Sequence, residues 1–233
     1  MKVLVTGASR GIGLAIAKAF AAKQYDVAIS SRSQEKLNQA KADILSKIDG
    51  ARVQTFVCDA SSKEAVLGLA EQIKSKWGGV DILVNNAGVY VPGSIGEADE
   101  GALETMLSTN LYSAYHITRA LLPMMQEKQA GDVVNICSIA SNTPYANGGA
   151  YSISKYAMYG FSKNLREEMK PHGVRVISVL PGGVFTDSWN GSGVDEMRIM
   201  PVEDIAELVV TACSLSRRSV VEDLIVRPQL GDL

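Results

Sequence analysis

The chain has 233 residues, of which 46% are hydrophobic, enough for a single extended core. Lysine and arginine number 23 against 25 acidic residues and form no basic run, so we expect no nucleic-acid partner. The apolar stretches are shorter than a membrane span, and the first residues reach a glycine turn too soon for a signal peptide, so we expect no membrane partner and a cytoplasmic location.

Cysteine and histidine usage argues against a metal site. Cys58, Cys137 and Cys213 lie far apart in apolar segments, which is typical of reduced core thiols rather than disulfides. His116 and His172 lack the spacing of metal ligands. We therefore expect no bound metal.

Short runs rich in β-branched residues alternate with longer helical patterns. The runs at 3–6, 26–30, 53–57, 82–84, 133–137, 174–179 and 224–226 are predicted strands. The segments at 11–22, 34–48, 63–77, 103–128, 150–170 and 202–215 are predicted helices. Strands that are apolar throughout are buried on both faces, so the alternation predicts an α/β fold with a seven-stranded parallel sheet between helices. No linker or repeat interrupts it, and one domain over residues 1–233 is expected.

A glycine-rich turn, Thr6-Gly7-Ala-Ser-Arg-Gly11-Ile-Gly13, connects the first strand to the first helix. Glycines let the backbone amides approach a pyrophosphate, and the helix N-terminus adds unpaired N–H donors. The spacing differs from the common Gly-x-Gly-x-x-Gly, and a purely structural turn is the alternative. That alternative does not explain three glycines that weaken a helix start. The candidate cofactor residues in this turn are Gly7, Ser9, Arg10, Gly11, Ile12 and Gly13.

The end of the second strand distinguishes between the two nicotinamide cofactors. An NAD-binding domain usually places a carboxylate there to bond the ribose 2′-hydroxyl. This chain has Ser31 and Arg32 instead, and Arg10 lies in the glycine turn, so two cations can converge on a 2′-phosphate. Taken singly, each arginine is better explained as a solvated surface residue, but together they favour NADP(H). Asp59 and Ala60, after the third strand, are weaker candidates for contact with the adenine ring.

A tyrosine and a lysine four residues apart, Tyr151 and Lys155, give the strongest chemical signal. The spacing puts both on one helix face, where the lysine charge favours the ionised phenol and makes it a useful proton donor near neutral pH. Tyr159 and Lys163 repeat the spacing eight residues later, so the spacing alone is a weak signal. We choose the first pair because Ser138 precedes it at the end of a predicted strand, whereas Tyr159 lies two turns inside the helix.

Together these motifs resemble the classical short-chain dehydrogenase/reductase family, and within it the NADP-dependent carbonyl and 3-oxoacyl reductases. The resemblance covers almost the whole chain. It implies a three-layer, doubly wound Rossmann fold with helices on both faces of the sheet. The motifs, in family order, are Thr6-Gly7-x-x-x-Gly11-x-Gly13, Asn85-Asn86-Ala87-Gly88, Asn110, Ser138, Tyr151-x-x-x-Lys155 and Pro181-Gly182.

The resemblance also implies a role for each matching residue. Tyr151 would be the general acid, and Lys155 would hold the nicotinamide ribose and lower the tyrosine pKa. Ser138 would polarise the substrate carbonyl. Asn110 would position a water linking Lys155 to solvent, the alternative being an ordinary helix asparagine. The remaining cofactor contacts that it implies are Asn86, Ala87 and Gly88 and, at the nicotinamide end, Pro181, Gly182, Val184 and Thr186.

Less can be read from the region that would cover the substrate. Residues 186–200 are predicted to form a substrate lid that is short for this family. By resemblance, the two long helices that carry Asn110 and Tyr151 would form a homodimer interface, and dimers would pair into a homotetramer. Candidate substrate contacts, of which the last four are equally well explained by loop packing, are Trp189, Met197, Val89, Tyr90, Thr143 and Tyr145.

We therefore predict an NADPH-dependent oxidoreductase that reduces a small-molecule ketone, aldehyde or 3-oxoacyl group to an alcohol. The same residues would catalyse alcohol oxidation, but the arginine pair favours NADPH and hence reduction. The alternative is an NADP(H)-binding regulatory or sensing protein without turnover, which need not keep all of the catalytic candidates. A scaffold protein, from a third class, leaves the glycine turn unexplained.

Overall fold

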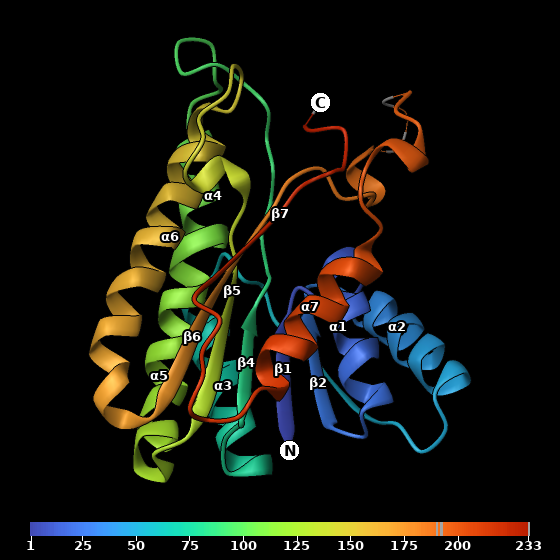
Figure 1. Cartoon of the computed structure of the whole chain (residues 1–233), viewed down its shortest axis with the longest axis vertical. Coiled ribbons are helices and arrows are strands. Elements are labelled where there is room, and N and C mark those ends of the chain that lie inside the picture. Colours follow the sequence, from blue (N-terminus) through green and yellow to red (C-terminus); the bar gives the residue numbers. More distant parts are fainter. Residues whose placement is uncertain (190, 192, 233) are drawn as a thin grey trace.

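The computed structural model of the chain describes residues 1–189, 191 and 193–232. Within them, seven strands form one sheet in the order β3-β2-β1-β4-β5-β6-β7, and every neighbouring pair is parallel. This confirms the predicted doubly wound sheet (Figure 1). The strands are β1 (Lys2–Thr6), β2 (Asp26–Ser31), β3 (Arg52–Val57), β4 (Ile82–Asn85), β5 (Gly131–Ile136), β6 (Val174–Pro181) and β7 (Asp223–Val226).

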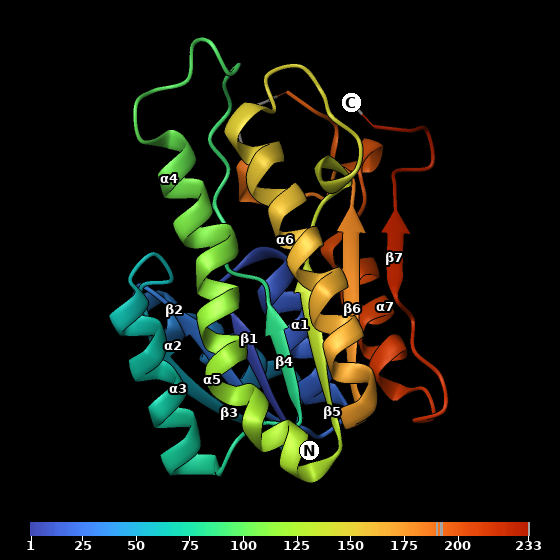
Figure 2. The same ribbon diagram turned by 90° about the vertical axis from the view of Figure 1, so that its left-hand side faces the viewer.

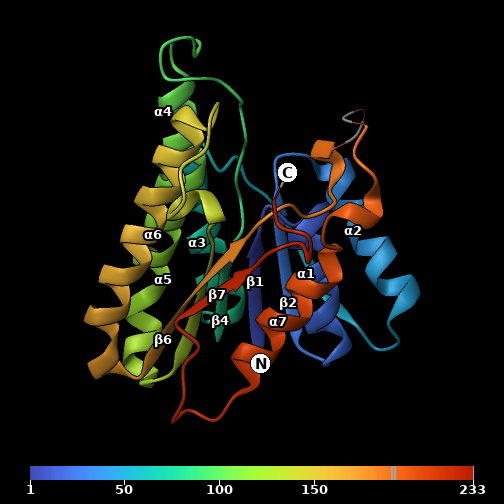
Figure 3. The same ribbon diagram turned by 45° about the horizontal axis from the view of Figure 1, so that its top comes forward.

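Helices cover both faces of the sheet and give the molecule three layers (Figures 1 and 3). One face packs against α1 (Gly11–Ala22), α2 (Gln34–Lys47) and α7 (Val202–Ser214). The other packs against α3 (Lys63–Trp77), α5 (Ser113–Lys128) and α6 (Gly149–Met169). Because each helix buries only one apolar stripe, the two cores are separated by the sheet itself. None of the helices in the described part of the chain is long and apolar enough to cross a membrane.

Burial differs between the centre and the edges of the sheet. All residues of β4, β5 and β6 are buried, as expected for parallel strands covered on both faces. The edge strand β3 alternates between buried and exposed positions, and no residue of β7 is fully buried. The apolar runs therefore identify the central strands best.

The predicted helix from 103 to 128 is interrupted in the structure. It consists of α4 (Ala102–Leu107), a π-helical turn η1 (Ser108–Tyr112) and α5. A π turn widens the helix by one residue and is frequent at functional sites. Asn110 lies in this turn. The short 3-10 helices are η2 (Ile139–Ser141), η3 (Lys170–His172), η4 (Asp187–Trp189) and η5 (Glu196–Arg198).

A buried polar ladder joins the centre of the sheet to the helices above it. Asn85 on β4 and Asn135 on β5 are register partners, and the Asn85 Nδ2 donates to Asn135 Oδ1 at 2.8 Å and to Thr118 Oγ1 at 2.9 Å. The Asn135 Nδ2 in turn donates to Ser162 Oγ on α6 at 2.7 Å. Buried polar groups are costly unless they are paired, so this ladder fixes how α5 and α6 sit on the sheet.

Candidate active site

The strand order reverses between β1 and β4, and the glycine turn opens there. In open α/β sheets, ligands bind in the crevice at such a reversal. Gly7 has φ +64°, and a Cβ added to it would lie 2.7 Å from the Ala87 Cα, so only glycine lets the two loops approach this closely. The Thr6 Oγ1 accepts from the backbone N–H groups of Asn86 and Ala87, both at 3.1 Å. The turn is thereby fixed to the loop after β4.

The third glycine of the turn is required by the same loop. A Cβ added to Gly13 would lie 2.4 Å from the Asn86 Nδ2, which donates to the carbonyl oxygens of Thr6 and Gly7 at 2.9 and 3.0 Å. Ile12 packs its side chain against the core, so only its backbone faces the turn. Arg10 is the N-cap of α1 and, within the described chain, forms no side-chain capping bond. The first N–H groups of α1 are thus oriented as an anion site requires.

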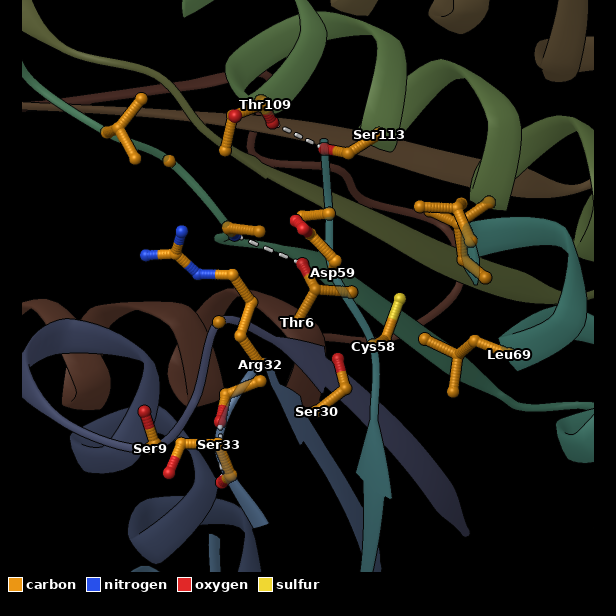
Figure 4. Close-up of a pocket in the computed structure, with 18 of the residues that line it drawn as sticks. Thr6, Ser9, Ser30, Arg32, Ser33, Cys58, Asp59, Leu69, Thr109 and Ser113 are labelled. Carbon is orange, nitrogen blue, oxygen red and sulfur yellow. Dashed lines mark hydrogen bonds between the residues drawn. The ribbon is translucent and has the colours of Figure 1, made fainter. Parts of the chain in front are cut away.

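A pocket of about 210 Å³ lies over the carboxyl ends of β1, β2 and β3 (Figure 4). Its walls combine cationic side chains with serine hydroxyls, a donor set that suits a phosphate group. Arg32 projects into it from the end of β2 (Figure 4). The predicted cofactor residues that line this one pocket are Gly7, Ser9, Arg10, Ser31, Arg32, Asp59, Ala60, Ala87 and Gly88.

The carboxylate in this pocket, Asp59, is held away from a ribose-binding role. Its Oδ1 accepts from the Ser61 backbone N–H at 3.0 Å and from the Ser61 hydroxyl at 2.8 Å. These hydrogen bonds, with a smaller contribution from the Arg32 charge, lower the pKa of Asp59. Arg32 and Lys36 outnumber this one carboxylate, so their side of the pocket keeps a net positive charge.

Arg10 has a different partner from the one expected. Its Nη1 donates to Asp187 Oδ2 at 2.9 Å, which connects the glycine turn to the first residues of the predicted lid. Both side chains are more than half exposed, so the ion pair is weak and can exchange for another anion. Arg10 still lines the pocket, but its guanidinium is shared between the pocket and the lid.

Tyr151 and Lys155 lie on the first turns of α6, above the end of β5. The Lys155 side chain is buried, with 6% of the residue exposed, and its Nζ donates to the Ile136 carbonyl oxygen at 2.9 Å. That bond uses one of the three N–H donors of the ammonium group. The Lys155 Nζ lies 5.8 Å from the centroid of the Tyr151 ring. The pair is thus anchored at the carboxyl end of the sheet, where the resemblance places it.

Ser138 lies two residues after the end of β5 and caps the short helix η2. Its Oγ accepts from the Ala140 backbone N–H at 3.1 Å, and its own N–H donates to the Ser141 Oγ at 3.2 Å. This reciprocal capping fixes the serine two residues beyond the carbonyl that holds Lys155. The same strand end therefore delivers both groups to the site.

Asn110 joins three parts of the site through its amide. Its Oδ1 accepts from the Val89 N–H at 2.7 Å, and its Nδ2 donates to the Val89 carbonyl oxygen at 3.0 Å and to Ser154 Oγ at 2.9 Å. Ser154 Oγ donates to the Tyr151 carbonyl oxygen at 2.8 Å. Hence Asn110 braces the loop after β4 against the turn that carries Tyr151. A bridging water from Asn110 stays a prediction.

The predicted nicotinamide contacts lie at the end of β6 and just after it. The Gly182 N–H donates to the Val226 carbonyl oxygen at 2.8 Å, and Val184 forms an isolated bridge with Met200, the last residue of the predicted lid. The Thr186 methyl carbon would lie 3.5 Å from a Cβ on Gly11, so this segment reaches back to the glycine turn. The predicted residues thus form two groups: the pocket set, and the strand-end set of Pro181, Gly182, Val184 and Thr186.

Several pocket residues escaped the sequence prediction. Lys36 had a detectable signal, because it is a cation in the first turn of α2, four residues after Arg32. The others have a sequence context that carries no sign of a pocket: one caps α2, and the rest lie on α3, η1 and α5. They are Ser33, Val66, Leu69, Thr109, Ser113 and Ile117.

The cysteines take no part in this arrangement as reactive thiols. Cys58, Cys137 and Cys213 are free and buried, as expected. Burial raises the pKa of Cys58 and of Cys137 to about 11, so both are protonated thiols at neutral pH. Among residues 1–189, 191 and 193–232, no three His, Cys, Asp or Glu side chains are grouped closely enough to hold a metal ion.

A dinucleotide-type crevice beside an anchored tyrosine–lysine pair defines a class of oxidoreductase. The family model for short chain dehydrogenases matches residues 1–196, and the chain belongs to that family. It is 34% identical to the sepiapterin reductase of Chlorobaculum tepidum, over 99% of this chain and 97% of that protein. It is 36% identical to a 3-oxoacyl-acyl-carrier-protein reductase of Haemophilus influenzae, over 79% and 74%. A serine dehydrogenase solved in a closed form with NADP+ has a TM-score of 0.91 and 30% identity, covering 100% and 97%.

Proposed function

We propose that this chain is an NADPH-dependent reductase that converts a small-molecule carbonyl group to an alcohol, with Tyr151 as the proton donor. One observation carries the proposal: the Lys155 Nζ is fixed on the Ile136 carbonyl, and Tyr151 and Ser138 lie at that strand end, beside the crevice. The proposal is supported by the position of the pair and the serine at the carboxyl end of the sheet, the edge at which open α/β sheets bind ligands.

The pocket suits the 2′-phosphate of NADP(H). No carboxylate ends β2, and the carboxylate of Asp59 is already bonded to Ser61. Arg32 and Lys36 supply positive charge on one wall, and Ser31 and Ser33 supply hydroxyl groups. Arginine binds a phosphate through its planar fork of donors. The closed serine dehydrogenase, similar over the whole chain, is complexed with NADP+.

Bound NADPH would supply the hydride, and the protein residues would control position and charge. The Lys155 ammonium, with one N–H bonded to Ile136, has donors left for the nicotinamide ribose and places its charge near the Tyr151 phenol. Tyr151 would donate a proton to the substrate oxygen as it gains negative charge. Ser138 would donate a hydrogen bond to the same oxygen. Asn110 would hold the helix turn and the loop in register.

The cofactor assignment is tested by titration with NADPH and NADH. Replacing Arg32 by Ser should weaken NADPH binding by about 1.5 to 3 kcal/mol, the contribution of a hydrogen bond to a charged group, and leave NADH binding nearly unchanged. Arg52→Ser is a matched control, because Arg52 pairs with Asp26 at the amino end of the sheet. Equal affinity of the parent for both cofactors would contradict the assignment.

The reaction is tested by NADPH consumption with a panel of ketones, aldehydes and a 3-oxoacyl thioester. Product formation in proportion to NADPH loss is the expected result. Tight NADPH binding with no turnover on any member would instead support a regulatory or sensing protein.

We also propose that residues 1–233 form one domain and that the protein is cytoplasmic.

We also propose a homodimer formed through α5 and α6, which lie side by side in Figure 2. An apolar groove crosses their outer surface, and the tyrosines along it are partly exposed. Exposed apolar surface of this kind marks interaction sites. Light scattering should give a dimer mass or a multiple of it. The groove is lined by Leu111, Tyr112, Tyr115, His116, Ala157 and Phe161.

A further inference from the structure

Three tyrosines meet at the substrate side of the site. The Tyr90 ring packs edge to face on the Tyr151 ring, with centroids 5.0 Å apart and planes at 86°. Tyr145 lies beside both: burial, and then the neighbouring Tyr90 and Tyr151 phenols, raise the pKa of Tyr145 well above its usual value. The proposed proton donor, Tyr151, therefore lies beside two uncharged aromatic rings, those of Tyr90 and Tyr145, which we call the aromatic wall.

The two loops that carry Tyr90 and Tyr145 are bonded to each other. The Gly93 N–H donates to the Asn147 carbonyl oxygen at 3.1 Å, and a Cβ added to Gly149 would lie 2.5 Å from the Gly93 carbonyl oxygen. The base of the Tyr90 loop is held by the two Asn110 bonds to Val89. Such fixed rings can bind a ligand without first being ordered, which favours affinity.

Both rings keep an open face. Tyr90 is 49% exposed and Tyr145 is 44% exposed, although each packs against a neighbour on one side. Val91 and Ile95 on the same loop are also exposed. An aromatic surface that is rigid, half-open and adjacent to the reacting phenol is a binding surface for a flat apolar group.

Charge distinguishes this side from the cofactor pocket. Residues 89–95 and 142–149 contain no charged side chain. Arg227 reaches the second of these loops, where its Nη2 lies 3.5 Å from the Thr143 Oγ1, but its Nη1 is paired with Asp232 at 3.3 Å. A substrate carboxylate or phosphate at the tyrosines would thus have to compete with Asp232 for Arg227, whereas an uncharged group would not.

We propose that the substrate is an uncharged carbonyl compound whose carbonyl carbon bears an aromatic ring, and that this ring packs on Tyr90 and Tyr145 while the oxygen lies at Tyr151. The inference rests on the proposed reductase function and adds the substrate class. An edge-to-face or offset contact with one aromatic ring corresponds to about a 2- to 12-fold effect, so two rings should give a preference of roughly tenfold or more.

The test compares acetophenone with two other ketones, with NADPH as the reductant. Cyclohexyl methyl ketone replaces the aromatic ring with a saturated ring of the same carbon number, and benzoylformate keeps the aromatic ring and replaces the methyl group with a carboxylate. We expect kcat/KM to be highest for acetophenone, by roughly tenfold or more over cyclohexyl methyl ketone. Equal values for acetophenone and cyclohexyl methyl ketone, or a preference for benzoylformate, would overturn the inference.

Variants test whether the aromatic wall, Tyr90 and Tyr145, causes the preference for acetophenone. Tyr90→Leu and Tyr145→Leu should each reduce the acetophenone preference by about 2- to 12-fold, mainly through KM, while Tyr90→Phe should keep it. Tyr25→Leu, a tyrosine next to β2 at the amino end of the sheet, is the control and should not change it. NADPH affinity reports whether each variant is folded. A preference that survives both leucine variants would refute the role of the two tyrosines. If the parent turns over none of the three ketones but reduces another carbonyl compound of the panel, the aromatic substrate class is refuted, whereas no turnover of the whole panel would refute the reductase function itself.

Discussion

Helix α6 carries two tyrosine–lysine pairs with the same spacing, Tyr151 with Lys155 and Tyr159 with Lys163, and the two pairs lie in different surroundings. Their local geometry is nearly the same. The lysine Nζ lies 5.8 Å from the ring centroid in the first pair and 5.0 Å in the second. The i, i+4 spacing alone therefore produces the pairing, wherever it occurs on a helix.

What differs is the partner of each lysine. Lys155 is 6% exposed and donates to a neutral backbone carbonyl at the end of β5. Lys163 has a 40% exposed side chain and pairs with the Asp223 carboxylate on β7, to which the Tyr159 hydroxyl also donates at 3.2 Å. The second pair is thus neutralised and fastens an edge strand. The tyrosine–lysine spacing therefore does not distinguish the two pairs. They differ in whether a neighbouring carboxylate neutralises the lysine charge.

The largest expected effect comes from removing the two phenol oxygens in turn. Tyr151→Phe should lower kcat by about 100- to 10,000-fold, the usual contribution of a general acid, and leave the NADPH dissociation constant nearly unchanged. Tyr159→Phe should stay within a few-fold of the parent. Steady-state kinetics and NADPH fluorescence titration check both, and equal losses in the two variants would mean that the first pair has no special role.

Replacing the lysines of the two pairs should also have different effects on NADPH binding and turnover. Lys155→Ala should lose both NADPH binding and turnover, because the ammonium group is proposed to hold the ribose and to act on Tyr151. Lys163→Ala should keep both. Isothermal titration with NADPH, followed by single-turnover assays, distinguishes the two outcomes. An unchanged NADPH affinity in Lys155→Ala would remove the lysine from the cofactor site.

Replacing Asn110 tests whether Tyr151 depends on the hydrogen bonds that Asn110 makes to Val89 and Ser154. Asn110→Ala leaves the Ser154 hydroxyl and the Val89 backbone without their amide partner, so the free energy of unfolding should fall by about 1 to 3 kcal/mol. A shifted Tyr151 should also lower kcat, by up to ~100-fold for a displacement near 1 Å. Asn164→Ala, at an exposed asparagine on α6, the helix that carries Tyr151, is the control. A fall in stability with unchanged kcat would limit Asn110 to a structural role.

The smallest effect concerns the second pair and depends on pH. Burial lowers the pKa of Lys163, but the hydrogen bonds and charge attraction from Asp223 and Tyr159 outweigh it, and the net pKa is raised above 10.5. A raised lysine pKa stabilises the fold fully below its unfolded value and loses that effect as the pH rises through the folded value. Lys163→Met should therefore lose up to about 1 kcal/mol at pH 7, and the difference should shrink above about pH 10.5. Urea unfolding across pH measures it, and a pH-independent difference would contradict the ion pair.

Much of the fold could be read from local patterns. The helices at 11–22 and 63–77 begin and end at the predicted residues. A capping serine marks the second of them, because the Ser62 Oγ accepts from the Ala65 N–H at the start of α3, whereas the first follows the glycine turn directly. The π turn at Asn110 was missed. The Asn110 amide in that turn bonds to Val89 and Ser154, which lie far from it in sequence, and no local pattern records those contacts.

Some features of the candidate site could likewise be read from the sequence, and others could not. The sequence by itself determined the glycine turn, the missing carboxylate after β2, the tyrosine–lysine spacing and the serine at a strand end, because each depends on backbone geometry within a few residues. Only the tertiary structure decided that Arg10 is shared with Asp187, that Lys163 is neutralised by Asp223, and that the Tyr90 ring packs on the Tyr151 ring. These are contacts between segments brought together by the sheet order, and charge and burial depend on such neighbours rather than on spacing along the chain.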